Sequence, residues 1–180
     1  MAHFVELESQ VDPTGFTTDI QLVVKRVVTV GDDIPAGGGT LGDNDMHIDG
    51  ETWCVNFFGG GTWKQTSYTG KFRQRFAQVG GQYDAAKDVF IDKRFYRSYS
   101  LDSENEWMSP TPYPSSVTYG DPSLDPQPTY TTYWDEPNLR YLGYDDNENE
   151  FLWDHDSKSW SSTGRVFNDS PFSGNPGQSG

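Results

Sequence analysis

Hydrophobic and polar residues alternate along much of the first half of the chain, with the period of two that is typical of β-strands. Four segments carry strand signals, by alternation or by runs of β-branched and aromatic residues: 3–8, 20–30, 52–58 and 61–68. Residues 20–30 are long enough for a full strand with a bulge at Lys25 and Arg26. The pattern therefore predicts an all-β fold.

Helical spacing is almost absent, and 19 glycines and 11 prolines interrupt the chain. Residues 71–81 are compatible with one short helix, because Phe72, Phe76 and Val79 have helix-like intervals. The first two also fit one face of a strand. Residues 31–50 are rich in Gly, Asp and Asn and predict a long polar loop.

A second pattern recurs in the later half of the chain. An aromatic or aliphatic residue precedes Asp, a few polar residues follow, and an aromatic residue closes the segment. Asp in such a turn can bond to the backbone two residues on, and the flanking rings can meet across two strands. The pattern predicts five β-hairpins, at residues 83–90, 101–107, 134–141, 144–151 and 153–160.

Six of the 11 prolines fall in residues 109–133, which predicts an extended segment that cannot form a central strand. We therefore expect a β domain at 1–108 built on a small twisted sheet or sandwich, and a Pro-rich strap or linker at 109–132. An acidic hairpin extension at 133–180 would follow, ending in an extended tail.

Composition favours a thin aromatic core, because the chain is 33% hydrophobic but 15% aromatic. The net charge of −14 disfavours nucleic acid as a partner. The lone Cys54 cannot form an internal disulfide, and we expect neither a signal peptide nor a membrane-spanning segment.

Charge is unevenly distributed, and the bases gather in residues 64–97. This cationic middle has two interpretations: a contact surface for a partner protein, or a solvated face whose charges are neutralised within the fold. The first interpretation assigns partner contact to six residues: Lys64, Lys71, Arg73, Arg75, Arg94 and Arg97.

No motif supports a catalytic, cofactor or metal site. Gly59 to Gly61 precede Lys64, but a phosphate-binding loop would need a hydroxyl residue after the Lys and a helix behind it, so a turn explains the glycines better. The acidic segments 42–51 and 145–150 match a calcium loop poorly. We expect no enzyme, no cofactor and no metal.

Tryptophans with polar neighbours offer one further possibility, because exposed rings can stack on sugar faces. Trp134 and Trp153 would form such a glycan platform. The alternative is that these rings belong to the core of a chain that has few aliphatic residues.

Several segments of the chain together resemble a known family. Trp63 to Tyr68, "WKQTSY", is followed by a basic stretch at 73–81, by "YDAAKDVFI" at 83–91 and by "LDSENEW" at 101–107. These motifs resemble the small WKQTSY-type proteins of tailed bacteriophages that infect marine cyanobacteria. The resemblance covers residues 1–8 and about 20–115, whereas residues 9–19 look inserted and 116–180 extend beyond the family's usual end.

The resemblance implies a virion protein without established catalysis, and it supplies no active-site residues. We therefore expect a structural accessory protein of a tailed-phage virion, present in many copies. It would dock on other virion proteins of the capsid surface or of the tail and baseplate, without nucleic acid or membrane. The alternatives are a glycan-binding host-adhesion module and, with less support from the residues, a cell-wall hydrolase.

Overall fold

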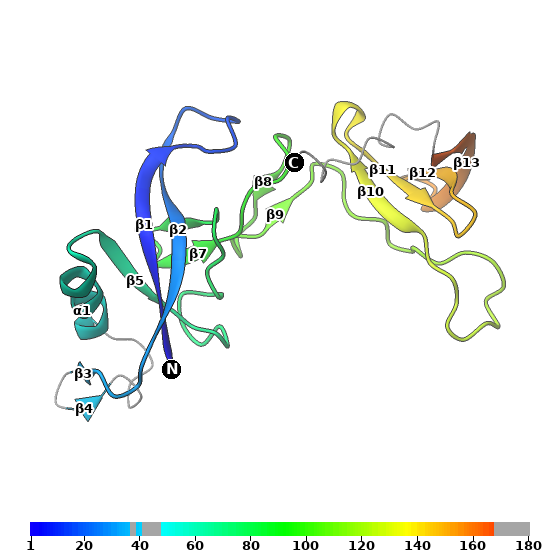
Figure 1. The fold of residues 1–180 in the computed structure, drawn as a ribbon. Helices are drawn as coiled ribbons and strands as arrows, with labels where there is room; N and C mark the ends of the chain where they lie inside the picture. Colours follow the sequence, from blue (N-terminus) through cyan, green and yellow to red (C-terminus); the bar gives the residue numbers. More distant parts are fainter. Residues whose placement is uncertain (37–38, 41–47, 168–180) are drawn as a thin grey trace. The chain divides into compact units, whose positions relative to one another are not determined.

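The structure is a computed structural model that describes residues 1–36, 39–40 and 48–167. The chain divides into two compact units. The first unit comprises Met1–Arg97 and Leu101–Trp107, and the second comprises Ser98–Ser100 and the chain from Met108 onward. The boundary lies close to the one predicted at residue 108. The fold is all-β apart from one α-helix in the described ranges (Figure 1).

A five-stranded antiparallel sheet forms the first unit, in the order β5-β1-β2-β6-β7 (Figure 1). Its strands are β1 (Ala2–Val11), β2 (Ile20–Val30), β5 (Thr62–Thr66), β6 (Gln82–Asp84) and β7 (Val89–Ile91). Two very short strands, β3 (Pro35–Ala36) and β4 (Gly39–Thr40), pair separately. The register of β1 and β2 shifts so that Lys25 has no partner, which confirms the predicted bulge.

Each face of this sheet carries a core cluster, and adjacent residues of β1 contribute to opposite clusters because they point to opposite sides. Phe4 packs with Cys54 and Trp63 on the side of helix α1 (Ile48–Phe58). Val5 packs with Phe90 in a cluster on the other side, to which the loop after β5 contributes Ala77. A helix and a loop thus cover the sheet, in place of the second sheet of a sandwich.

Helix α1 overturns the strand predicted at 52–58. Trp53 and Phe57, four residues apart, stack with ring centroids at 4.7 Å, a contact that a helix provides and a strand does not. The glycines explain where the helix ends. Gly59 has φ +77°, and the N–H of Gly60 donates to the carbonyl of Val55 at 2.8 Å, as in a Schellman cap.

The short helix considered for residues 71–81 does not form. Arg73 and Gln74 both have positive φ, which breaks any helical run. The polar loop predicted at 31–50 is shorter than expected, because α1 already begins at Ile48. Part of that loop, and the predicted tail after residue 167, lie outside the described residues.

Each of the five predicted hairpins is present, and their turns share a backbone feature. Every turn contains one residue with positive φ: Asp88, Asn105, Leu139, Glu148 and Lys158. In four turns the predicted Asp accepts backbone N–H bonds, as Asp154 does from residues 156 and 157. In three of the five hairpins the facing rings are in contact, with centroids 4.9–5.2 Å apart.

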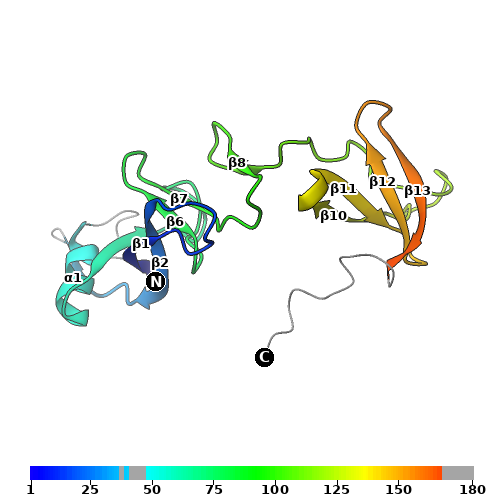
Figure 2. The same ribbon diagram turned by 90° about the horizontal axis from the view of Figure 1, so that it is seen from above.

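The second unit contains a four-stranded antiparallel sheet whose strands follow one another in chain order (Figure 2). They are β10 (Thr131–Asp135), β11 (Arg140–Tyr144), β12 (Asn149–Asp154) and β13 (Ser159–Val166), with the 3-10 turn η2 (Glu136–Asn138) after β10. The short strands β8 (Ser100–Leu101) and β9 (Trp107–Met108) form the remaining hairpin.

The Pro-rich segment is packed on the second unit rather than forming a separate linker. It has no strand before β10 and one isolated bridge, between Thr118 and Thr129. The ring nitrogen of Trp160 donates to the carbonyl of Ser116 at 2.7 Å, and Tyr130 contacts the Trp160 ring. The strap therefore supplies part of this unit's own aromatic packing.

Candidate functional site

The cationic middle of the chain folds around acidic partners of the first unit. Arg73 is its most buried member, with a side chain 6% exposed. Its guanidinium donates at 2.7 Å each to Glu51 Oε1, to Asp88 Oδ1 and to the carbonyl of Gln65. Lys64 bonds to the other oxygen of Glu51 at 3.2 Å. These charges are neutralised within the fold.

Burial and hydrogen bonding shift the pKa values of this network. Burial acts to raise the pKa of Asp88, but the bonds from Tyr83 and Arg73 outweigh it and hold that pKa below its ordinary value. Burial and the bond to Asp88 raise the pKa of Tyr83 to about 12. The network is therefore stable as a protonated phenol beside an ionised carboxylate.

The other predicted contact residues have different surroundings. Arg75 pairs with Asp92 at 2.7 Å and also with Glu106. Arg94 and Arg97 lie over aromatic rings, both within 6 Å of the ring centre of Phe16. Lys71 is exposed beside the loop after β5. Of the two interpretations of the cationic middle, internal neutralisation describes Lys64, Arg73 and Arg75.

The proposed glycan platform has no exposed rings. Trp134 is 4% exposed and Trp153 is 5% exposed. Trp134 packs edge-on against Tyr141, and Trp153 contacts Trp160 across the strands. Both are core residues of the second unit, as the alternative interpretation stated.

The described residues contain neither a metal-binding cluster nor a membrane-spanning helix, and their one cysteine is not reactive. No group of three or more His, Cys, Asp or Glu in residues 1–36, 39–40 and 48–167 could hold a metal ion. In the same ranges, no helix is long and apolar enough to cross a membrane. Cys54 is fully buried, and burial together with the charge of Glu51 raises its pKa to about 11, so the thiolate is disfavoured.

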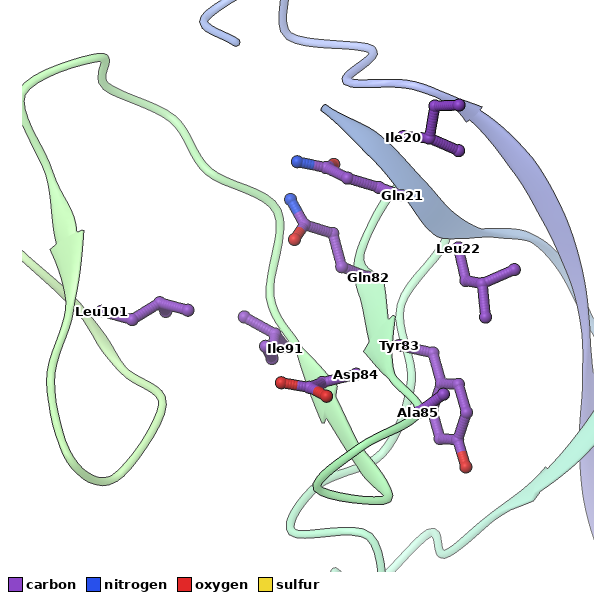
Figure 3. Close-up of a pocket in the computed structure, with 9 residues that line it drawn as sticks. All are labelled: Ile20, Gln21, Leu22, Gln82, Tyr83, Asp84, Ala85, Ile91 and Leu101. Carbon is purple, nitrogen blue, oxygen red and sulfur yellow. The ribbon is translucent and has the colours of Figure 1, made fainter. Parts of the chain in front are cut away.

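A pocket of about 360 Å³ opens in the first unit where β2 continues past the end of β6 (Figure 3). Strand alternation explains its lining. Tyr83 and Phe90 point into the core, so their neighbours Gln82, Asp84 and Ile91 point to the opposite face. The full lining is Ile20, Gln21, Leu22, Gln82, Tyr83, Asp84, Ala85, Ile91 and Leu101.

The polar groups of this pocket are hydrogen-bond acceptors and amides. Gln21 Oε1 is buried and has no hydrogen-bond partner among the described residues. The side chains of Gln21 and Gln82 point toward the same space, and the Asp84 carboxylate is directed into it (Figure 3). No Lys or Arg lines the pocket. It can therefore accept hydrogen bonds and favours a cation over an anion.

Three rings of helix α1 form what we call the α1 aromatic surface: Trp53, which is half-buried against the core, and the exposed Phe57 and Phe58. Phe57 is 66% exposed, although it stacks on Trp53 and meets Phe58 edge-on. The guanidinium of Arg26 lies 4.6 Å from the centre of the Phe58 ring. Aromatic residues and arginine are the types that dominate binding energy in protein interfaces.

Comparison of the chain with protein-family models, with curated proteins and with solved structures finds no match.

Two features of the candidate sites escaped the sequence interpretation. Gln21 has no distinguishing sequence signal, because its role depends on where β6 ends. Phe57 and Phe58 fall in the strand predicted at 52–58. Their i and i+4 spacing from Trp53 and Cys54, followed by three glycines, was a signal that could have revealed the helix.

Proposed function

We propose that the protein is a structural accessory of a tailed-phage virion that docks on another virion protein, on the capsid surface or on the tail and baseplate. The observation that carries the docking is the α1 aromatic surface, where three rings and a cation lie together at the surface of the unit. The assignment to a virion rests on the family resemblance of residues 1–8 and about 20–115.

The contact we assign differs from the one expected from the sequence. Arg73 and Arg75 already satisfy carboxylates of their own unit, and freeing them would leave buried charges unpaired. The Pro-rich strap is packed on the second unit. Aromatic side chains have a small free-energy cost of desolvation and bury a large area on binding. The α1 aromatic surface is therefore a better contact than the cationic residues.

The burial of Trp134 and Trp153 removes the feature on which the glycan-binding alternative depended. The hydrolase alternative has no supporting sequence motif, and no group of three or more His, Cys, Asp or Glu among the described residues could hold a metal ion. We therefore propose neither.

Mass spectrometry of phage particles purified on a caesium chloride gradient tests the virion assignment. The protein should remain with the particles at a constant ratio to the major capsid protein. Its absence from intact particles would remove the proposal.

A pair of matched variants tests the contact. Phe57→Ser removes a ring of the α1 aromatic surface, whereas Phe95→Ser removes a ring of equal size that is also exposed, 72%, in the same unit. We expect Phe57→Ser to reduce incorporation into particles at least about tenfold, a typical effect for a central interface ring. Phe95→Ser should be incorporated normally, and equal losses would exclude α1 as the contact.

A further inference from the structure

We propose that the pocket beside β2 and β6 binds an arginine side chain of a partner protein. The proposal goes beyond the virion assignment and needs that assignment only to say which partner supplies the arginine. Gln82, Asp84 and Ile91 line the pocket from the face of the sheet opposite the core, whereas Leu22 and Tyr83 line it from the side of the core.

Size limits the ligand to a small group. Pockets that hold small molecules span roughly 300–1,000 Å³, and this one, at about 360 Å³, lies near the lower end. One long side chain fits such a volume, whereas a strand, a nucleotide or an oligosaccharide would need an extended groove.

The polar groups select a hydrogen-bond donor that carries positive charge. Gln21 Oε1 is a buried acceptor without a partner, and Asp84 contributes a carboxylate whose Oδ1 already accepts the N–H groups of Ala86 and Lys87. Because no Lys or Arg of the described residues lines the pocket, a phosphate or carboxylate ligand would be repelled by Asp84 without a compensating cation. A guanidinium presents several donors in one plane, which suit either an amide oxygen or a carboxylate.

The apolar groups fit the rest of an arginine side chain. Ile91 and Leu101 line the space beside Gln82 from two strands (Figure 3), and Ile91 is only 5% exposed. The methylene stem of arginine packs on such aliphatic surface while its head reaches polar groups. The net charge of −14 also attracts a basic partner.

The orphaned acceptor is a further reason to expect a ligand. Five buried side-chain atoms of the described residues lack hydrogen-bond partners, and Gln21 Oε1 is the one at this pocket. A buried acceptor without a partner destabilises the fold, and an aliphatic residue would avoid that cost. A glutamine at this position is explained if a bound donor completes its hydrogen bonding.

Titration of the full chain, labelled with ¹⁵N, with N-acetyl-arginine amide tests the proposal. We expect saturable shifts of the side-chain amides of Gln21 and Gln82 and of the backbone of Leu22, with binding in the millimolar range that suits a ligand of this size. No shifts up to about 50 mM would overturn the proposal. Equal binding of N-acetyl-lysine amide would overturn the guanidinium assignment, and shifts caused instead by a neutral disaccharide would replace it.

Matched variants separate recognition from folding. Asp84→Asn keeps the turn, since the amide oxygen can accept the same two N–H bonds, but removes the charge, and should weaken binding about tenfold. Asp154→Asn makes the same change in a turn of the second unit with the same hydrogen bonds, at a residue that does not line the pocket, and should leave binding unchanged. Equal effects of the two variants would refute the role of Asp84.

Gln21→Leu gives a second, independent readout. It should abolish the arginine shifts while leaving the urea midpoint of the first unit unchanged or raised, because the unpaired acceptor is gone. A lower midpoint would show that Gln21 serves the fold, against the proposal. These outcomes are independent of particle mass spectrometry, so pocket and virion assignment can fail separately.

Discussion

Replacing Arg73 with Met should destabilise the first unit more than any other single change in its charged network. Methionine keeps the length of the side chain. The backbone at this residue has φ +53° and is equally strained with either side chain. What is lost is the guanidinium, which donates to Glu51, Asp88 and the carbonyl of Gln65.

The magnitude follows from the exposure of each partner. The Glu51 side chain is 12% exposed and would keep only Lys64 and one backbone N–H, so a buried charge becomes poorly compensated. Breaking such a pair costs about 3 kcal/mol, the lower end of the usual range because some partners remain. Asp88 is 48% exposed, and water replaces its bond at a cost of less than about 1 kcal/mol.

Urea unfolding, followed by hydrogen exchange of peptides from each unit, provides the measurement. With a slope of about 1.5 kcal/mol per M, a loss of about 3 kcal/mol lowers the midpoint of the first unit by ~2 M. Peptides of the second unit should be unaffected and serve as an internal reference. Arg75→Met is the matched control. Its carboxylate partners are 39% and 52% exposed, so we expect a loss of about 1 kcal/mol or less.

Two results would refute this reasoning. Equal losses of unfolding free energy for Arg73→Met and Arg75→Met would mean that burial of an ion pair does not determine the cost of breaking it. Adding Glu51→Gln to Arg73→Met should recover part of the loss, because the unpaired charge disappears. If the losses of stability caused by Arg73→Met and by Glu51→Gln simply add in the double variant, the two residues are not coupled.

Further predictions concern pH, reactivity and packing. Because the folded pKa of Tyr83 is raised from 10 to about 12, its contribution to stability is complete below pH 10 and is lost as the pH rises toward 12. Tyr83→Phe should remove this alkaline loss in unfolding curves. Cys54, fully buried with a pKa of about 11, should react with a thiol reagent only in denaturant, and rapid native reaction would contradict its burial. Gly143→Val should destabilise the second unit by about 2 kcal/mol, since a Cβ there lies 2.9 Å from the Trp160 ring; unchanged exchange in β11 would contradict this.

The hairpins were predictable because their signals are local. An Asp that caps its own turn and a ring on each side specify the hairpin within about eight residues, whatever surrounds it. The register that brings Trp153 opposite Trp160 follows from the turn alone. The bulge in β2 was predictable for the same reason, as two cations interrupt a β-branched run.

Helix α1 and the pocket were not predictable in this way, because tertiary contacts decide them. The sequence of 52–58 is β-branched and aromatic, which suits either a strand or a buried helix, and packing of Cys54 against Phe4 resolves the choice. The role of Arg73 depends on Glu51, 22 residues away, which enters the network only because the segment folds as a helix. Because the sequence predicted a strand at 52–58 instead of a helix, it did not reveal that Glu51 pairs with Arg73.

A chain with few aliphatic residues uses its rings for stability, and this makes the exposed rings informative. Phe90, Trp134 and Trp153 are buried, and each is explained by the core in which it packs. Phe57 is a ring of the same kind left 66% exposed, on a helix whose other face already packs on the sheet through Cys54. Its removal should cost the fold little, and the contact with another protein proposed above would explain why this ring, with Trp53 and Phe58 beside it, lies at the surface.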